Sequence, residues 1–354
     1  MKKIFCFLAA IAAVITIASC NKHKRTEPAV PSLKGVLVLN NGNWGSNDAS
    51  VTVFDPVSGT AEGNMFYSAN GQKLGDTGQD MLRCGNELYI AVSGSKVVFV
   101  TDLELNIKAV VEASDKDAKL QPRHIAYAGG KVYVTYYDGF LGEIDPETHS
   151  VRLTKVGANP EGVAYADGKL YVANSGGLLY ESGYNNTVSV VDAASFKEVS
   201  TITVNCNPQS VVANADGTLI YVSSWGNYAD LLPKLQTIET STSKVTDTDY
   251  ADVKSIAMGK DDILLVVTGG YDENWNIVGT VWKHNAKTDS KAGKFTQTAI
   301  ANYYSLSADA VTGNVFVGTS DYKTNGDVYC FDASGKQTAK FDSQGLNPLK
   351  CIML

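Results

Sequence analysis

The feature that most constrains the fold is an internal repeat. Residues 120–136 read LQPRHIAYAGGKVYVTY, residues 158–174 read ANPEGVAYADGKLYVAN, and the two align without a gap. Pro122 matches Pro160, and Tyr133 matches Tyr171. Repetition at a fixed period indicates one supersecondary unit that buries its apolar faces against copies of itself.

The repeating unit reads as four strands. A short apolar strand follows a proline, and then come a glycine turn, a second strand, a third strand that commonly ends in Asp, and a more polar fourth strand. The second strand recurs as GVLVLNN, ELYIAV, KVYVTY, KLYVAN, LIYVSS, ILLVVT and NVFVGT, at spacings of 38 to 52 residues. Third strands are recognisable as SVTVFDP, VVFVTD, LGEIDP, TVSVVD, GTVWKHN and DVYCFD.

This pattern predicts an all-β fold, a seven-bladed β-propeller with four antiparallel strands per blade. A β-sandwich does not repeat its sequence, and a β-helix has shorter coils. The segment LNPLKCIML at 346–354 matches the first strand of a unit, whereas the first unit starts directly with a second strand. We therefore expect the C-terminal strand to complete the first blade, which removes a free sheet edge.

The N-terminal segment is typical of a targeting signal. MKK is followed by an apolar run at 4–17 that is too short to span a bilayer comfortably. The run ends in IASC, which resembles the bacterial lipoprotein signal, in which the cysteine is acylated and becomes the first mature residue. The resemblance implies a signal peptide at 1–19, a lipid anchor at Cys20 and a tether at 20–34, before a propeller at 35–354. An ordinary secretory signal is the alternative.

Four further cysteines lie in the propeller region, at Cys84, Cys206, Cys330 and Cys351. None is at C-x-x-C spacing, so the sequence gives no support for a zinc or redox site. A disulfide can form in the oxidising cell envelope, and the sequence does not assign a pairing.

The segment NPEGVAYADGKLYVANSG, followed by NTVSVVDAASFKEVSTITV, resembles the YncE-like, surface-layer type of seven-bladed propeller over essentially the whole mature chain. Together with the lipoprotein signal, NNGNWGSNDASVTVFDP resembles the start of the BtuG proteins of Bacteroides-type bacteria. This resemblance implies an outer-membrane lipoprotein at the cell surface that captures cobalamin or related corrinoids. It implies delivery to a BtuB-like TonB-dependent transporter, membrane contact through the lipid only, and no required cofactor. A periplasmic orientation stays open.

The loops indicate which face binds ligand. AGGK, ADGK, ADGT and DPETHS read as tight turns, whereas the loops between second and third strands are long and aromatic. One loop aromatic usually packs onto its own blade, but a set on one face is typical of an interaction site. The expected ligand contacts are Asn43, Trp44, Arg123, Tyr137, Tyr180, Tyr184, Trp225, Tyr228, Tyr271, Trp275, Tyr303 and Tyr322.

The first strands of a propeller line its central channel, so the variable positions near their starts should lie at the channel mouth. These positions are Gln79–Asp80, Arg123–His124, Glu161–Gly162, Gln209–Ser210, Lys254–Ser255 and Tyr304–Ser305. His124 and Glu161 could form a general acid–base pair. Propeller lyases and lactonases place polar groups at this rim, the lactonases with a divalent metal. No Asp, Glu or Asn set repeats in a metal-ligand pattern, so we expect no metal site and no catalytic residue.

Charge excludes one class of partner. The formal net charge is −7, and a nucleic-acid binder would normally be basic. Three functions remain: a propeller that captures a corrinoid for a transporter, an envelope enzyme that uses the channel mouth, and a scaffold that docks a glycan or a protein.

Overall fold

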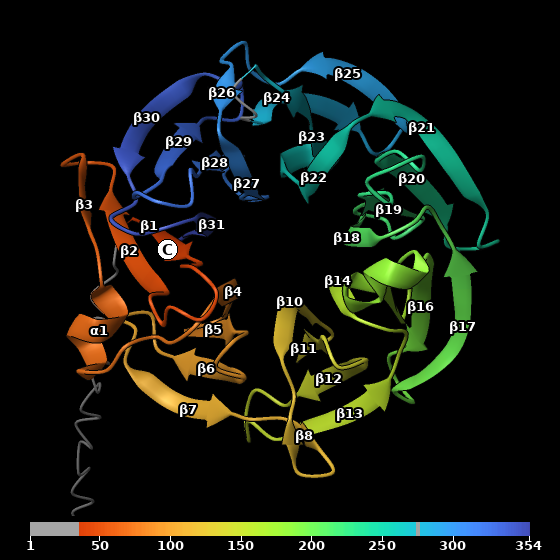
Figure 1. The fold of residues 1–354 in the computed structure, drawn as a ribbon, viewed down its shortest axis with the longest axis horizontal. Helices are drawn as coiled ribbons and strands as arrows, with labels where there is room; N and C mark the ends of the chain where they lie inside the picture. Colours follow the sequence, from red (N-terminus) through yellow and green to blue (C-terminus); the bar gives the residue numbers. More distant parts are fainter. Residues whose placement is uncertain (1–34, 274–276) are drawn as a thin grey trace, which may run out of the picture. The chain divides into compact units, whose positions relative to one another are not determined.

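The computed structural model describes residues 35–273 and 277–354; the signal peptide, Cys20, the tether and Trp275 lie outside these ranges. Residues Leu33–Leu354 form one compact unit. In it, seven antiparallel blades surround a central opening (Figure 1). The predicted seven-bladed β-propeller is therefore confirmed.

Each blade contributes one strand to each of four concentric layers. The innermost strands are β31 (Pro348–Met353), β4 (Gly78–Cys84), β10 (Pro122–Ala128), β14 (Pro160–Ala166), β18 (Pro208–Ala213), β22 (Val253–Met258) and β27 (Tyr303–Ala308). The second strands are β1 (Val36–Asn40), β5 (Glu87–Val92), β11 (Lys131–Tyr136), β15 (Lys169–Asn174), β19 (Leu219–Ser224), β23 (Ile263–Tyr271) and β28 (Val315–Thr319). The third strands are β2 (Ser50–Asp55), β6 (Val97–Thr101), β12 (Phe140–Ile144), β16 (Thr187–Asp192), β20 (Lys234–Glu239), β24 (Ile277–Asn285) and β29 (Asp327–Phe331). The outermost strands are β3 (Thr60–Glu62), β7 (Ile107–Val111), β13 (Val151–Lys155), β17 (Lys197–Thr203), β21 (Val245–Ala251), β25 (Ser290–Lys294) and β30 (Gln337–Asp342).

Five smaller elements interrupt this scheme, and the repeat pattern did not predict them. They are the helix α1 (Met65–Asn70), the hairpin β8 (Ser114–Asp115) and β9 (Ala118–Lys119), the strand β26 (Ile300–Ala301), and the 3₁₀ turns η1 (Gly177–Ser182) and η2 (Lys260–Asp262). The third strand of the fifth blade, β20, was also missed, because most residues of KLQTIE are polar.

The C-terminal strand closes the ring as expected. Strand β31 pairs antiparallel with β1, with Leu37 opposite Ile352 and Val36 opposite Met353. Strand β1 pairs on its other side with β2, so all five of its residues are buried. The first blade is thus assembled from both ends of the propeller, and β1 has no free edge.

The blades pack through their second strands, which are apolar on both faces. The tyrosine at the centre of the second strand, followed by Val or Ile, is almost fully buried in four blades, at Tyr89, Tyr133, Tyr171 and Tyr221. Tyr89 belongs to a hydrophobic cluster with Val132 and Val134 of the next blade. The repeated sequence therefore supplies the contacts between blades that hold the ring together.

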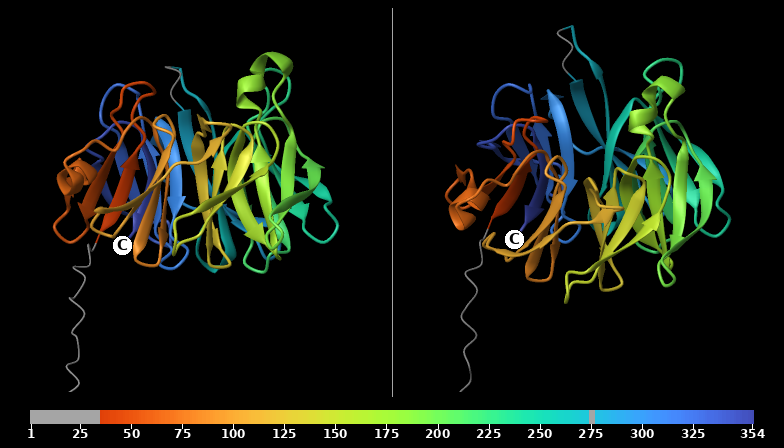
Figure 2. Two further views of the ribbon diagram at one scale, coloured as in Figure 1. Left: turned by 90° about the horizontal axis from the view of Figure 1, so that it is seen from below. Right: turned by 60° about the horizontal axis from the view of Figure 1, so that its bottom comes forward.

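The two faces of the ring differ in their loops, as the sequence predicts. One face carries short turns such as 128–131, where Gly129 and Gly130 have φ of 57° and 77° and so favour glycine. On the other face, η1 and the adjoining ends of β23 and β24 project beyond the blades (Figure 2). We call this the long-loop face.

Within the residues that the structure describes, no helix combines the length and the apolar character that crossing a membrane would require.

Candidate functional site

A β-bulge directs side chains of every innermost strand into the channel. The register shifts close to the first residue of each strand: at Gly78/Asp80, Pro122/Ile125, Pro160/Val163, Pro208/Ser210, Val253/Ser255, Tyr303/Ser305 and, where β31 meets β1, Lys350/Pro348. A bulge places two residues opposite one, which re-aims the side chains beside it. The variable positions of the repeat therefore lie together at one end of the channel.

The residue before the strand explains the recurring Asn-Pro of the repeat. Six blades have a left-handed backbone at this position: Thr77, Asn159, Asn207, Asp252, Asn302 and Asn347 have φ between 49° and 63°. Asn and Asp tolerate this conformation better than most residues, and proline is acceptable as the first residue of a strand. In the third blade the equivalent residue is Gln121.

These strands enclose a cavity of about 490 Å³ at the channel mouth. All the variable pairs identified in the sequence contribute to its lining, and β31 adds Leu349 and Lys350. This volume falls within the roughly 300–1,000 Å³ that is typical of small-molecule sites. Apolar side chains such as Ile125 and Val211 also line it, and its charged and hydroxyl groups form two arcs with different chemistry.

One arc begins with a bidentate ion pair between neighbouring blades. Arg123 on β10 donates from Nε and Nη2 to the two carboxylate oxygens of Glu161 on β14, at 2.9 and 2.8 Å. Its Nη1 donates to Gln79 Oε1 on β4 at 2.8 Å. The guanidinium also stacks over the ring of Tyr137, 4.8 Å from the centroid. Arg123 is thus held on all sides by protein groups.

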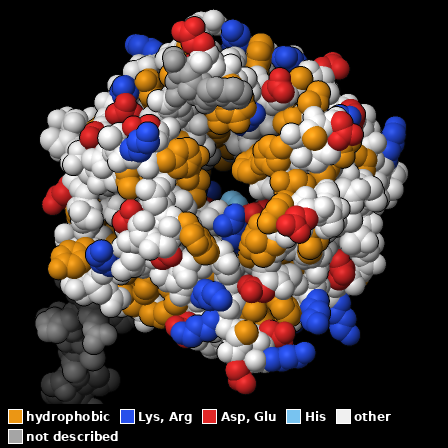
Figure 3. All heavy atoms as spheres, viewed as in Figure 1, with side chains coloured by type: hydrophobic (Ala, Val, Ile, Leu, Met, Phe, Trp, Pro, Cys, Tyr) orange, Lys and Arg blue, Asp and Glu red, His pale blue; other side chains and the backbone are white. Residues whose placement is uncertain are grey.

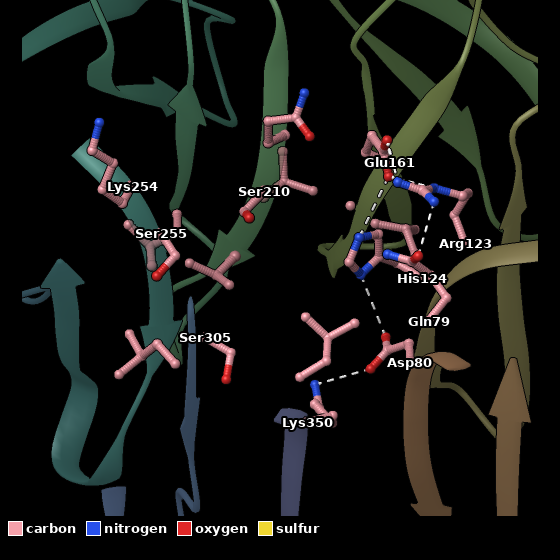
Figure 4. A pocket seen from close by; sticks show the side chains of 18 of the residues that line it. Gln79, Asp80, Arg123, His124, Glu161, Ser210, Lys254, Ser255, Ser305 and Lys350 are labelled. Carbon is pink, nitrogen blue, oxygen red and sulfur yellow. Dashed lines mark hydrogen bonds and ion pairs between the residues drawn. The ribbon is translucent and has the colours of Figure 1, made fainter. Parts of the chain in front are cut away.

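The same arc continues through His124 (Figure 4). The His124 imidazole lies between two carboxylates, with Nε2 3.5 Å from Glu161 Oε2 and Nδ1 3.6 Å from Asp80 Oδ2. Asp80 accepts backbone N–H bonds from Met81 and Ile125 and pairs with Lys350 at 3.2 Å. We call Asp80, Arg123, His124, Glu161 and Lys350 the charged arc.

The charged groups of this arc favour one another's ionised forms. Burial raises the pKa of Asp80, but Lys350 and His124 outweigh burial and leave that pKa below its ordinary value. The pKa of Glu161 is likewise lowered, because Arg123 and His124 outweigh burial. Burial lowers the pKa of His124, but its contacts with Asp80 and Glu161 outweigh burial and leave that pKa raised. An imidazole that stays protonated to higher pH is a weak general base near neutrality.

The opposite arc is neutral except for one lysine. Ser210 on β18, Lys254 and Ser255 on β22, and Ser305 on β27 line this side, and we call them the serine arc (Figure 4). Ser255 shares a hydrogen bond with the hydroxyl of Tyr303, and Ser305 donates to the carbonyl of Pro348 at 2.6 Å. Within residues 35–273 and 277–354, Lys254 has no acidic partner at ion-pair distance, although its ammonium lies 5.4 Å from the ring centroid of Tyr271.

Around this mouth the long-loop face is apolar and aromatic. The most exposed aromatic side chains in these loops are Trp44 (67 %), Tyr180 (61 %), Tyr228 (69 %), Tyr271 (58 %) and Tyr322 (61 %). Hydrophobic side chains gather around the opening in the space-filling view (Figure 3). We call Trp44, Tyr180, Trp225, Tyr228, Tyr271 and Tyr322 the aromatic rim.

Contacts between loops fix several members of the rim. The Trp225 indole N–H donates to the carbonyl of Lys254 at 2.9 Å, which leaves the side chain 38 % exposed. Tyr184 packs against Tyr228 at 6.0 Å between ring centroids, and Tyr304 against Tyr322 at 5.7 Å. Aromatic groups held in this way offer contact area at a small entropic cost on binding.

The remaining expected contacts lie elsewhere. Asn43 and Tyr184 are partly buried in the loops, and Asn43 donates to the carbonyl of Tyr322 at 3.3 Å. Tyr303 was expected to contact ligand from an exposed position, which is wrong, because it begins β27 and is 6 % exposed. Arg123 lies near the start of the first strand β10, and Tyr137 is half-buried beneath it.

Sequence reasoning missed Lys350 and the pairing of the charged arc. A signal was available, because equivalent positions of successive repeats carry opposite charges: Arg123 aligns with Glu161, and Lys350 precedes Asp80 around the ring. Among the described residues, no group of three or more His, Cys, Asp or Glu side chains could hold a metal ion. All four described cysteines are free thiols.

Ring and mouth together define a seven-bladed β-propeller with a small-molecule-sized polar cavity below an aromatic rim. The chain belongs to the family described as Domain of unknown function (DUF5074), whose profile matches residues 34–346. No curated protein matches the sequence.

Two solved structures illustrate the likeness in fold. Hydrazine synthase of Kuenenia stuttgartiensis is 16% identical, with a TM-score of 0.57 over 70% of this chain and 74% of that one. A chain of a mitotic checkpoint complex is 13% identical, with a TM-score of 0.54 over 77% of this chain and 86% of that one. At such identities the likeness shows the fold alone.

Proposed function

We propose that this protein is a ligand-capture propeller, not an enzyme, and that its ligand is cobalamin or a related corrinoid. The observation that carries the proposal is the aromatic rim around a polar cavity of about 490 Å³. Soluble proteins rarely expose large apolar patches unless the patch binds something. Aromatic groups of this kind supply much of the energy at binding surfaces.

The shape and chemistry of a corrinoid match this arrangement. A corrin ring is broad and roughly flat, and its edge is fringed with amides. The ring would lie across the mouth on the aromatic rim, because a cavity of about 490 Å³ is too small to enclose it with its side groups. Amides would then reach the hydroxyl and amide groups of Ser210, Gln209 and Asn41, which line the cavity below.

The rest of the proposal concerns cellular context and rests on the sequence. Cys20 would carry a lipid and anchor the propeller to the outer membrane, with the long-loop face available to ligand at the cell surface. The captured corrinoid would pass to a BtuB-like TonB-dependent transporter. No cofactor is required for capture, and membrane contact is made through the lipid only.

Calorimetric titration of cobalamin into the chain from Leu33 onward tests the proposal. We expect one cobalamin per chain, and we expect the protein to retain its colour through gel filtration. If micromolar protein gives no heat and retains no colour while circular dichroism shows an intact fold, the hypothesis of a corrinoid ligand is excluded. A glycan or protein ligand is then favoured.

A pair of variants locates the site. Tyr228→Ala removes a rim aromatic and should weaken binding by about 1.5–3 kcal/mol, the value of one buried large side chain. Tyr127→Ala is the matched control, because Tyr127 is similarly exposed but lies beside the tight turn on the opposite face. Equal affinities in the two variants would place the ligand away from the aromatic rim.

A protein-docking scaffold is the second candidate, and exposed leucines favour it. Leu178 and Leu179 on η1, with Leu231 and Leu232 in the loop between β19 and β20, are exposed on the long-loop face. Exposed leucines beside aromatics are typical of a protein interface. Replacing Leu178 and Leu232 with Ser should leave cobalamin affinity unchanged if this patch contacts a transporter instead.

A further inference from the structure

The lining of the cavity has a positive surplus in an acidic protein. Arg123, Lys254 and Lys350 contribute three cationic groups against the two carboxylates of Asp80 and Glu161. The raised pKa of His124 adds a further charge whenever its imidazole is protonated. The whole chain carries −7. A cationic cavity with low-dielectric walls attracts anions even when the surrounding protein is acidic.

The unbalanced positive charge of the cavity lining belongs to Lys254. Arg123 pairs with Glu161 and Lys350 with Asp80, so these four charges balance. Among the described residues no carboxylate lies within ion-pair distance of the Lys254 ammonium. An ammonium that lines a cavity without a protein counter-ion is available to pair with an anionic group of a ligand.

The surroundings of Lys254 suit an anionic group joined to a flat apolar one. Its backbone carbonyl holds the indole of Trp225, and its ammonium lies over the ring of Tyr271, so two members of the aromatic rim flank it. Ser210 and Ser255 line the same cavity as Lys254 and carry hydroxyl groups. Hydroxyls and a lysine together are common ligands of phosphate oxygens.

We propose that Lys254, with Ser210 and Ser255, forms a subsite for a phosphate group of the ligand. The inference deepens the proposed function and rests on it in one respect: in cobalamin, the group that occupies the subsite is the phosphodiester of the nucleotide loop. Arg123 does not serve this purpose, because its guanidinium is already occupied by Glu161, Gln79 and Tyr137.

The first experiment uses inorganic phosphate as the probe and does not depend on a corrinoid. Backbone amide shifts of the chain from Leu33 onward are followed by NMR while phosphate replaces chloride at constant ionic strength. We expect saturable shifts confined to residues 209–211 and 253–256. Lys254→Met should weaken phosphate at least tenfold, whereas Lys254→Arg, which keeps the charge, should retain most of the binding.

The control variant is Lys323→Met, which removes the same charge from an exposed position on the long-loop face. Its phosphate affinity should stay within about twofold of the parent, because Lys323 does not line the cavity and the field of an exposed charge is strongly screened at 0.1 M salt. Equal losses in Lys254→Met and Lys323→Met would show a diffuse field effect and overturn the subsite. Absence of saturable shifts in the parent protein would also overturn it.

The second experiment separates this inference from the proposed function. Cobalamin is compared with cobinamide, a corrinoid that lacks the nucleotide loop and its phosphate. We expect Lys254→Met to weaken cobalamin about tenfold and to leave cobinamide almost unchanged. Tight cobalamin binding that Lys254→Met does not alter would overturn the subsite and leave corrinoid capture intact. Phosphate binding at Lys254 without any corrinoid binding would support the subsite and end the corrinoid proposal.

Discussion

The charged arc and the serine arc face each other across one cavity, yet their polar groups are used differently. In the charged arc each ionised group meets an opposite charge from a neighbouring blade, as Arg123 meets Glu161. In the serine arc, Lys254 has an aromatic neighbour but no carboxylate partner among the described residues. Loop length does not follow this division. The blades of β4 and β10 have short loops at 93–96 and 137–139, but the other two strands of the charged arc, β14 and β31, belong to blades with long loops at 175–186 and 41–49.

The difference shows that the same position of the repeat, at the bulge of the innermost strand, can either stabilise the ring or bind a ligand. Where neighbouring blades place opposite charges at the bulge, the side chains satisfy one another and fasten the blades together. Where neighbouring blades place hydroxyl groups and a single lysine at the bulge, these groups remain available to bind a ligand. Removing groups from the charged arc should therefore affect mainly stability, and removing groups from the serine arc should affect mainly binding.

The largest effect should follow from deleting residues 347–354. This removes β31, takes Lys350 from the charged arc and exposes one edge of β1. Because β1 lies between β2 and β31, the truncated chain should aggregate or fail to fold. Gel filtration and thermal melting measure this outcome. A truncated chain that stays monomeric and melts at the parent temperature would show that the ring closes elsewhere.

The next effect tests the charged arc alone. Glu161→Gln leaves Arg123 and His124 without their shared carboxylate, and unfolding in denaturant should show a loss of about 3–5 kcal/mol, as for other broken buried ion pairs. Ser210→Ala is the matched change in the serine arc and should stay within about 0.5 kcal/mol of the parent. If both variants lose the same stability, the two arcs do not differ in the way that we describe.

The third effect is a pH dependence that belongs to the charged arc. His124 has a raised pKa in the folded state, so its contribution to stability is present below its unfolded pKa and is lost as pH rises through the folded pKa. Asp80 and Glu161 have lowered pKa values, so their contribution is lost only as pH falls through those values. The difference in melting temperature between the parent and His124→Gln should therefore be larger at pH 6 than at pH 9. A difference that is independent of pH would mean that His124 is not charged in this network.

The smallest effect concerns the stability of the serine arc. Lys254→Met removes the cation–π contact with Tyr271, which is worth about 0.5–1 kcal/mol. Denaturant unfolding should therefore change by no more than that amount, while phosphate affinity falls. A larger loss of stability would indicate that Lys254 has a structural partner and would weaken the contrast with Arg123.

The ring could be predicted from the sequence because the repeated residues make the same contacts in each blade. Asn159-Pro160 and Asn347-Pro348 mark strand starts, and the Tyr171-Val172 pair marks a strand that is buried between neighbours. Such local signals depend only on the unit itself, so strand order and ring closure followed from the period. The alignment of the repeats also predicts that the variable positions lie at the channel mouth.

The site was predicted less well because its contacts join different units. Arg123 was expected to await a ligand, but the ring brings Glu161 of the next blade within 2.8 Å of it. Tyr303 was expected to contact ligand from an exposed position, but the bulge of β27 turns it inward to Ser255. Loop aromatics such as Trp44 and Tyr228 were correctly placed on one face, since loop membership alone determines the face.

Ring closure by β31 also sets an order in time. Strand β1 is among the first parts of the propeller to be synthesised, and its partner β31 is the last. Val36 therefore has no partner on that side until Met353 has been synthesised. At roughly 5–20 residues per second, the interval is about 15–60 s, during which β1 has only β2 beside it. The ring cannot be completed until β31 has been synthesised, and a ribosome or export channel that stalls before β31 leaves an open arc of blades.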